Sequence, residues 1–166
     1  MDEHFLTDFR ATIARASERL LTLSDEEASQ RPAPGKWSPK EIIGHLIDSA
    51  ANNHARFVRG QLPADPQFSK YEQEGWVRVQ RYQDRRWSDI VRLWQAYNEH
   101  LAWVVEAADR ATLDREFTAP GLDDILWKPL DNGRVPTLGY FMTDYVVYLK
   151  HQLRQVIGHA FLPASA

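Results

Sequence analysis

The sequence predicts an all-α four-helix bundle that forms one domain over residues 1–166. Four long segments place apolar residues three and four positions apart, which is the spacing of one helical face. A long segment without that spacing separates the second helix from the third, and no stretch alternates apolar and polar residues over several hairpins. Four long helices with one long connection are typical of a bundle, and 166 residues can bury its core.

The first two helices are predicted over residues 4–23 and 39–60. In the first helix, one face carries the apolar residues Phe5, Phe9, Ile13, Ala16 and Leu20. The second helix has the clearest start signal of the chain. Ser38 is the expected N-cap, Pro39 occupies the first helical position, and Glu41 completes a capping box.

The segment from residue 62 to residue 86 differs from the helices on either side of it. Pro63, Pro66 and Gly75 interrupt any long period, although large apolar side chains are present. About 25 residues exceed a simple helix–helix turn. We therefore expect an ordered crossover packed by its aromatic residues, with one short helix around residues 72–79. Such a crossover lets the second and third helices run parallel.

The last two helices are predicted on either side of a second irregular segment. The third helix begins at Trp87 or Ser88 and ends near Ala108, and the fourth runs from Thr137 to Gly158. Residues 109–136 between them contain several prolines and glycines and show no long helical period.

Composition and charge exclude several classes of function. The chain has 20 Lys+Arg against 23 Asp+Glu, a net charge of −3, which argues against a nucleic-acid partner. It has no cysteine, which excludes disulfides, cysteine-ligated zinc, iron–sulfur clusters and thiol catalysis. No apolar run approaches the ~20 residues of a membrane span, so no membrane partner is expected. The acidic, polar N-terminus is not a secretory signal, and a cytoplasmic location is the default expectation.

The polar residues of the second helix are the candidate functional feature. His45, Ser49, Asn52 and Arg56 follow a 4-3-4 spacing that places them on one stripe, and Asp48 borders it. Such a stripe either faces water or lines a pocket between helices, where bundle proteins build their sites. The pattern alone leaves both interpretations open.

The same region resembles a known family. Residues 35–49, Gly-Lys-Trp-Ser-Pro-Lys-Glu-Ile-Ile-Gly-His-Leu-Ile-Asp-Ser, are similar to the signature of the DinB/YfiT-like superfamily. The continuation Asn52-Asn53-His54-x-Arg56-Phe57 is similar to one DinB subfamily. The resemblance spans essentially the whole chain. It implies an up-down-down-up four-helix bundle that is often a homodimer, and Trp103 is our candidate for the dimer surface.

The resemblance also implies a divalent metal, usually zinc or nickel, held by three histidines. One belongs to the His-Leu motif of the second helix, which His45 matches, and two stand at positions i and i+4 of the fourth helix. Some members of the family are thiol-dependent S-transferases or isomerases. Histidines at i and i+4 share one helical face, so they can bind one ion together with a third ligand from a facing helix.

This sequence departs from the family pattern in the fourth helix. In residues 145–155, Tyr148 and Gln152 occupy the positions of the two ligand histidines, and His151 aligns with a neighbouring histidine that is not a ligand. No other register restores the pair, because His151 and His159 stand eight residues apart, about 12 Å along a helix axis. A neutral glutamine is a poor zinc ligand, and one histidine alone binds a metal weakly.

Two hypotheses of function follow. The favoured one is a metal-free relative whose polar pocket binds a small molecule or only holds the bundle in register. The alternative is a metal-dependent enzyme of the thiol S-transferase or hydrolase type, with zinc or nickel bound at His45. The candidate pocket residues are His45, Asp48, Ser49, Asn52, Tyr148 and Gln152.

Overall fold

Four long helices make up the bundle in the computed structural model, which describes residues 3–62, 68–116, 121–122, 124–130 and 134–158. The long helices are α1 (Glu3–Leu20), α3 (Pro39–Gln61), α5 (Trp87–Ala107) and α7 (Leu138–Ile157). Four short helices connect them: α2 (Asp25–Ser29), α4 (Gln73–Gln80), the 3₁₀ helix η1 (Tyr82–Asp84) and α6 (Arg110–Asp114). Over these residues the structure has no β-strand, only an isolated bridge between Glu116 and Thr137. The predicted all-α bundle is confirmed.

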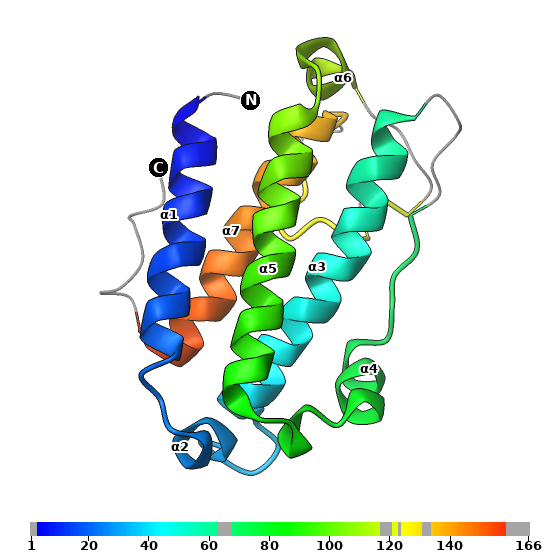
Figure 1. The fold of residues 1–166 in the computed structure, drawn as a ribbon. Helices are drawn as coiled ribbons and strands as arrows, with labels where there is room; N and C mark the ends of the chain where they lie inside the picture. The colour runs from blue at the N-terminus through cyan, green and yellow to red at the C-terminus, as the bar shows by residue number, and fades with distance from the viewer. Residues whose placement is uncertain (1–2, 63–67, 117–120, 123, 131–133, 159–166) are drawn as a thin grey trace.

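The direction of the helices gives the up-down-down-up order. Helices α3 and α5 run parallel to each other, and α1 and α7 run in the opposite direction (Figure 1). Helix α1 packs against both α5 and α7, and so does α3. The crossover with α4 and η1 returns the chain along the bundle, so that α5 starts at the same end as α3 (Figure 1).

The start of α3 forms as the sequence predicts. Ser38 Oγ accepts the backbone N–H of Glu41 at 3.3 Å, and a Glu41 carboxylate oxygen accepts the N–H of Ser38 at 2.9 Å. The side-chain amide of Gln83 in η1 donates to both of these side chains, to Ser38 Oγ at 2.8 Å and to Glu41 Oε2 at 3.2 Å. The capping box therefore also attaches the crossover to the first turn of α3.

The observed ends of the helices differ little from the predicted ones. Helix α1 ends at Leu20 rather than near residue 23, and α4 lies one residue beyond the predicted 72–79. Helix α6 was not predicted, because a single turn capped by Asp109 is too short to produce a helical period. The expected dimer surface residue Trp103 is 63% exposed on α5, and the homodimer stays a prediction. Among the described helices, none has the length and apolar character that crossing a bilayer requires.

Two ion pairs with buried lysines hold the helices in place. Lys150 of α7 lies 2.6 Å from Asp8 of α1, and Lys40 of α3 lies 2.7 Å from Asp25 of α2. Both lysine side chains are less than 5% exposed. Because a buried ammonium without a partner is strongly destabilising, these pairs fix which residues of neighbouring helices face each other.

Gly44 allows the crossover to approach α3 closely. A Cβ atom at this position would overlap the ring of Tyr82, which is 1% exposed. The contact places the Tyr82 hydroxyl 2.7 Å from Asp48, one turn further along α3. The glycine thus positions a buried hydrogen bond between the crossover and α3.

We predict that Gly44→Ala destabilises the protein although alanine is the better helix former. The helix propensity of alanine would stabilise by about 1 kcal/mol. Displacing the Tyr82 ring should cost more, about 1–3 kcal/mol for overpacking, and should weaken its bond to Asp48. Urea denaturation of both proteins measures the net change. A variant more stable than the wild type would show that the ring does not pack against this glycine.

Candidate functional site

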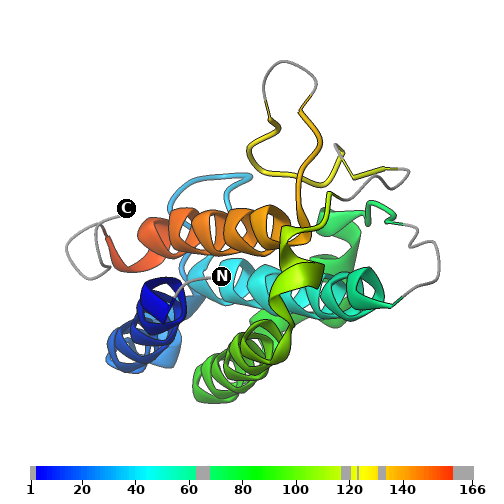
Figure 2. The same cartoon turned by 90° about the horizontal axis from the view of Figure 1, so that it is seen from above.

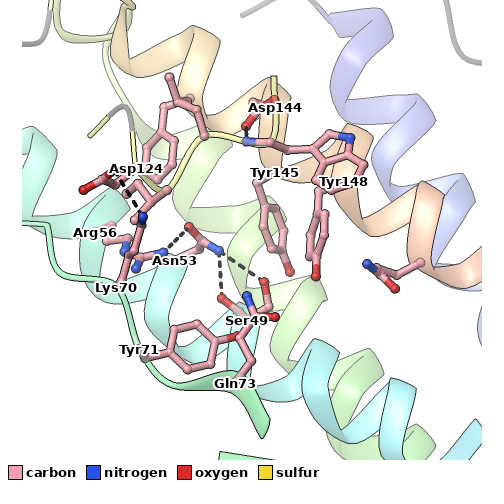
Figure 3. A pocket seen from close by; sticks show the side chains of 15 residues that line it. Ser49, Asn53, Arg56, Lys70, Tyr71, Gln73, Asp124, Asp144, Tyr145 and Tyr148 are labelled. Atoms are coloured by element: carbon pink, nitrogen blue, oxygen red, sulfur yellow. Dashed lines mark hydrogen bonds and ion pairs between the residues drawn. The ribbon is translucent and has the colours of Figure 1, made fainter. Parts of the chain in front are cut away.

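A pocket of about 400 Å³ lies between α3 and α7. Segments 70–73 and 124–127 complete its wall (Figure 3). In the view from above, the described parts of the chain between α6 and α7 lie beside α7, on the side away from α1 and α5 (Figure 2). The lining residues are Ser49, Asn53, Arg56, Lys70, Tyr71, Gln73, Asp124, Ile125, Leu126, Trp127, Phe141, Asp144, Tyr145, Tyr148 and Gln152.

The wall formed by α3 is polar and internally bonded. The Asn53 amide donates to the backbone oxygen of Ser49 at 2.9 Å and to its hydroxyl at 3.3 Å. The carbonyl end of that amide accepts Nη1 of Arg56 at 3.3 Å, and Nη2 of Arg56 donates to the backbone oxygen of Ser69 at 2.6 Å. All three side chains of α3 are more than 90% buried. This chain of bonds holds the Arg56 guanidinium in one orientation.

His45 lies behind two of the lining tyrosines. Its Nε2 is 2.6 Å from the hydroxyl of Tyr148 on α7, and its Nδ1 is 3.5 Å from the hydroxyl of Tyr71. A neutral imidazole has one donor and one acceptor, so it can pair with both hydroxyls. Burial lowers the pKa of His45 to about 4 and raises the pKa of Tyr148 to about 12. Both groups are therefore neutral at physiological pH.

Asp48 faces the crossover. It accepts the Tyr82 hydroxyl at 2.7 Å and the Gln80 amide at 2.5 Å. Its other oxygen is buried and has no hydrogen-bond partner among the described residues. Burial raises the pKa of Asp48, while the bonds from Tyr82 and Gln80 act in the opposite direction. Asn52 donates its amide to the backbone oxygen of Asp48 at 2.8 Å.

Asp144 positions the wall opposite α3. Its two carboxylate oxygens accept the backbone N–H groups of Trp127 and Lys128, at 2.7 Å and 2.9 Å. These bonds attach the loop to α7 and bring the Trp127 indole to 5.2 Å from the ring of Tyr148. Burial raises the pKa of Asp144, and the two backbone bonds oppose that shift.

The structure brings together part of the predicted set. Ser49, Tyr148 and Gln152 line the pocket, and His45 contacts Tyr148 from behind. Asp48 and Asn52 lie outside the lining. The sequence placed Arg56 on the stripe but not among the pocket residues, and it did not assign Asn53, Tyr71, Trp127, Asp144 and Tyr145 to the pocket. The 4-3-4 spacing was the signal for Arg56, whereas the loop residues carry no periodic signal.

These residues do not fit a divalent metal. Next to His45, helix α7 offers the protonated phenol of Tyr148 and the neutral amide of Gln152, and the His45 Nε2 already pairs with that phenol. No group of three histidine, aspartate or glutamate side chains within the described part of the chain could hold an ion. A zinc or nickel site is normally built from several imidazole, thiolate or carboxylate ligands. His45 alone therefore does not make such a site.

Comparison with known proteins identifies relatives over most of the chain. The family model of the DinB superfamily matches residues 8–139. A protein of Oceanobacillus iheyensis is 23% identical over 103 residues, 62% of this chain and 59% of its own length. A protein of Bacillus mycoides is 24% identical over 109 residues, 63% of this chain and 61% of its own. Both are provisionally named metal-dependent hydrolases, and the match spans about three fifths of each.

A solved structure shares the fold. YfiT from Bacillus subtilis, described as a probable metal-dependent hydrolase with an unusual four-helix bundle topology, superposes with a TM-score of 0.74. The alignment covers 94% of this chain and 86% of YfiT at 16% identity. This likeness shows a common architecture, and a common architecture does not establish a common function.

The buried neutral state of His45 predicts a specific loss of stability in acid. The unfolded histidine takes up a proton near pH 6.5, but the folded one does so only near pH 4. The wild type should therefore lose about 3 kcal/mol of unfolding free energy between these pH values through His45. His45→Gln, which keeps a hydrogen-bonding group for Tyr148, should lack this loss.

Urea denaturation between pH 7 and pH 4 measures the effect as the difference between the wild type and His45→Gln. This difference removes the contributions of Asp48 and Asp144, whose raised pKa values act with the opposite sign. His151→Gln, at an exposed position of α7, is the control and should follow the wild type. An equal acid sensitivity of wild type and His45→Gln would mean that His45 is not buried in the neutral form.

Proposed function

The chain belongs to the DinB superfamily, and from that premise we propose that it is a metal-free member that binds a small molecule in the pocket between α3 and α7. The observation that carries this proposal is the 2.6 Å contact between His45 Nε2 and the Tyr148 hydroxyl. It gives the one remaining histidine of the family's ligand set a neutral partner within the protein. The Tyr148 hydroxyl thus forms a hydrogen bond with His45 Nε2, at the nitrogen that would otherwise bind a metal.

The shape and composition of the pocket support ligand binding over a purely structural role. A volume of about 400 Å³ is within the usual range for small-molecule sites. The α3 wall carries hydrogen-bonding groups, and Phe141, Trp127 and Leu126 supply an apolar wall. Concave sites of this kind bind ligands by burying their apolar surface and orient them through a few polar groups.

Metal-dependent hydrolysis is the second candidate, and the provisional names of the two bacterial relatives favour it. It would require an ion to displace the Tyr148 hydroxyl from His45 Nε2. It would also require Tyr148 or Gln152 to act as a ligand, and in the metal-free protein burial raises the pKa of Tyr148 to about 12 and keeps the phenol protonated. The two candidates therefore differ in a single measurable quantity, the metal content of the folded protein.

Elemental analysis should find zinc and nickel well below one equivalent per chain. The protein is expressed without a histidine tag and is supplied with each metal in turn. His45→Ala should leave the small residual content unchanged, as should the matched control His151→Ala at an exposed position of α7. One equivalent of metal that disappears in His45→Ala and persists in His151→Ala would replace the metal-free proposal with the metal-dependent one.

Filling the pocket should abolish ligand binding. Gln152 lines the pocket, whereas Thr143 on the same helix is exposed and lies outside the lining. A fragment library observed by saturation-transfer NMR should give ligands for the wild type and Thr143→Trp, and these signals should be lost in Gln152→Trp. Fragments that still bind Gln152→Trp would place the binding surface elsewhere.

A further inference from the structure

The charged groups of the pocket are paired except for one. Lys70 and Asp124 form an ion pair at 3.1 Å near the surface, with side chains 62% and 65% exposed. Both oxygens of Asp144 accept backbone N–H groups. Arg56 is only 8% exposed, and no carboxylate of the described residues lies within ion-pair distance of its guanidinium.

Arg56 also has unused hydrogen-bonding capacity. Its bonds to Asn53 Oδ1 and to the backbone oxygen of Ser69 use one N–H of each terminal nitrogen. The other N–H groups of the guanidinium have no acceptor among the described residues, and Arg56 lines the pocket. Since arginine remains charged in proteins, burying it without a counter-charge is costly. Burial accordingly lowers the pKa of Arg56, consistent with an unpaired cation.

We propose that Arg56 binds the carboxylate of a small organic acid whose apolar or aromatic body lies against the α7 side of the pocket. This inference rests on the proposed function, because it names the ligand class of the same pocket. A guanidinium matches a carboxylate in geometry and forms two parallel, charge-assisted hydrogen bonds with it. One unpaired cation matches a monoanion better than a phosphate monoester, which carries about −1.5 to −2 charges at neutral pH.

The two sides of the pocket suit the two ends of such a ligand. Figure 3 shows Arg56 and Asn53 on one side of the pocket and Tyr145 and Tyr148 on the other. The Asn53–Ser49 bonds hold the guanidinium before a ligand arrives, so little side-chain entropy is lost on binding. The Trp127 indole beside Tyr148 offers an aromatic face that can stack on a ring of the ligand.

Matched pairs of acids and amides test this inference. The probes are 1-naphthylacetate, 3-phenylpropionate and benzoate, each paired with its primary amide, which has nearly the same shape and no charge. Dissociation constants come from NMR titration of the wild type at low salt. The acid that binds best should bind about tenfold or more tightly than its amide, because a charge-assisted bond is lost with the charge.

Two arginine variants assign that preference to a residue. Arg56→Gln should reduce the ratio between amide and acid dissociation constants to near one. Arg59→Gln, at an exposed position of the same helix, should leave the ratio unchanged. Thermal melting establishes that each variant is folded. Because the comparison of acid with amide is made on the wild type itself, it holds even if Arg56→Gln fails to fold.

The outcomes separate this inference from the proposed function. Equal binding of acids and amides, abolished by Gln152→Trp, would overturn the role of Arg56 and leave the pocket as a small-molecule site. A preference for acids that persists in folded Arg56→Gln would also overturn it. Absence of binding by every probe, while library fragments still bind the wild type and not Gln152→Trp, would overturn this inference alone. Absence of binding by both the probes and the library, or binding that Gln152→Trp does not affect, would contradict the pocket as the binding site and both proposals with it.

Discussion

A buried polar group needs a hydrogen-bond partner inside the protein, and helix α3 buries a series of them on its inner side. The partners lie on two elements: that of His45 is on α7, and those of Asp48 and Arg56 are on the crossover, at Tyr82 and Ser69. The apolar core tolerates small changes in helix rotation, but a 2.6 Å hydrogen bond does not. These contacts therefore determine how the crossover and α7 lie against α3, and with them the shape of the pocket.

The long helices were predictable because their signals are local. Apolar spacing, the Ser38–Glu41 capping box and the breaker residues act within one or two turns of the chain, and the four helices form where these signals place them. The direction of α3 and α5 followed from the length of the crossover. Helix α6 was not predicted, because a single turn with Asp109 as its N-cap has too few residues to show a helical period.

The site was predictable only where it depends on helix faces. His45 and Tyr148 could be paired because the family pattern places both positions toward the same point of the bundle. The 4-3-4 spacing led us to place Asn52 rather than Asn53 in the pocket, since the spacing alone does not determine the rotation of α3. Asn53 faces the pocket, while Asn52 bonds to the backbone of its own helix. Trp127 reaches the pocket through Asp144, a contact across 17 residues that no local signal encodes.

The uncharged state of His45, Tyr148 and Gln152 decides where the positive charge of the pocket lies. A bound divalent ion is often the largest charge in a site and attracts anionic groups to itself. Here His45, Tyr148 and Gln152 are all neutral, because burial keeps the imidazole unprotonated and the phenol protonated. The unpaired positive charge of the pocket then belongs to Arg56, about three turns further along α3. An anionic ligand would accordingly be oriented by a fixed guanidinium at the far end of the stripe, where a carboxylate can accept two bonds, rather than at the His45 position.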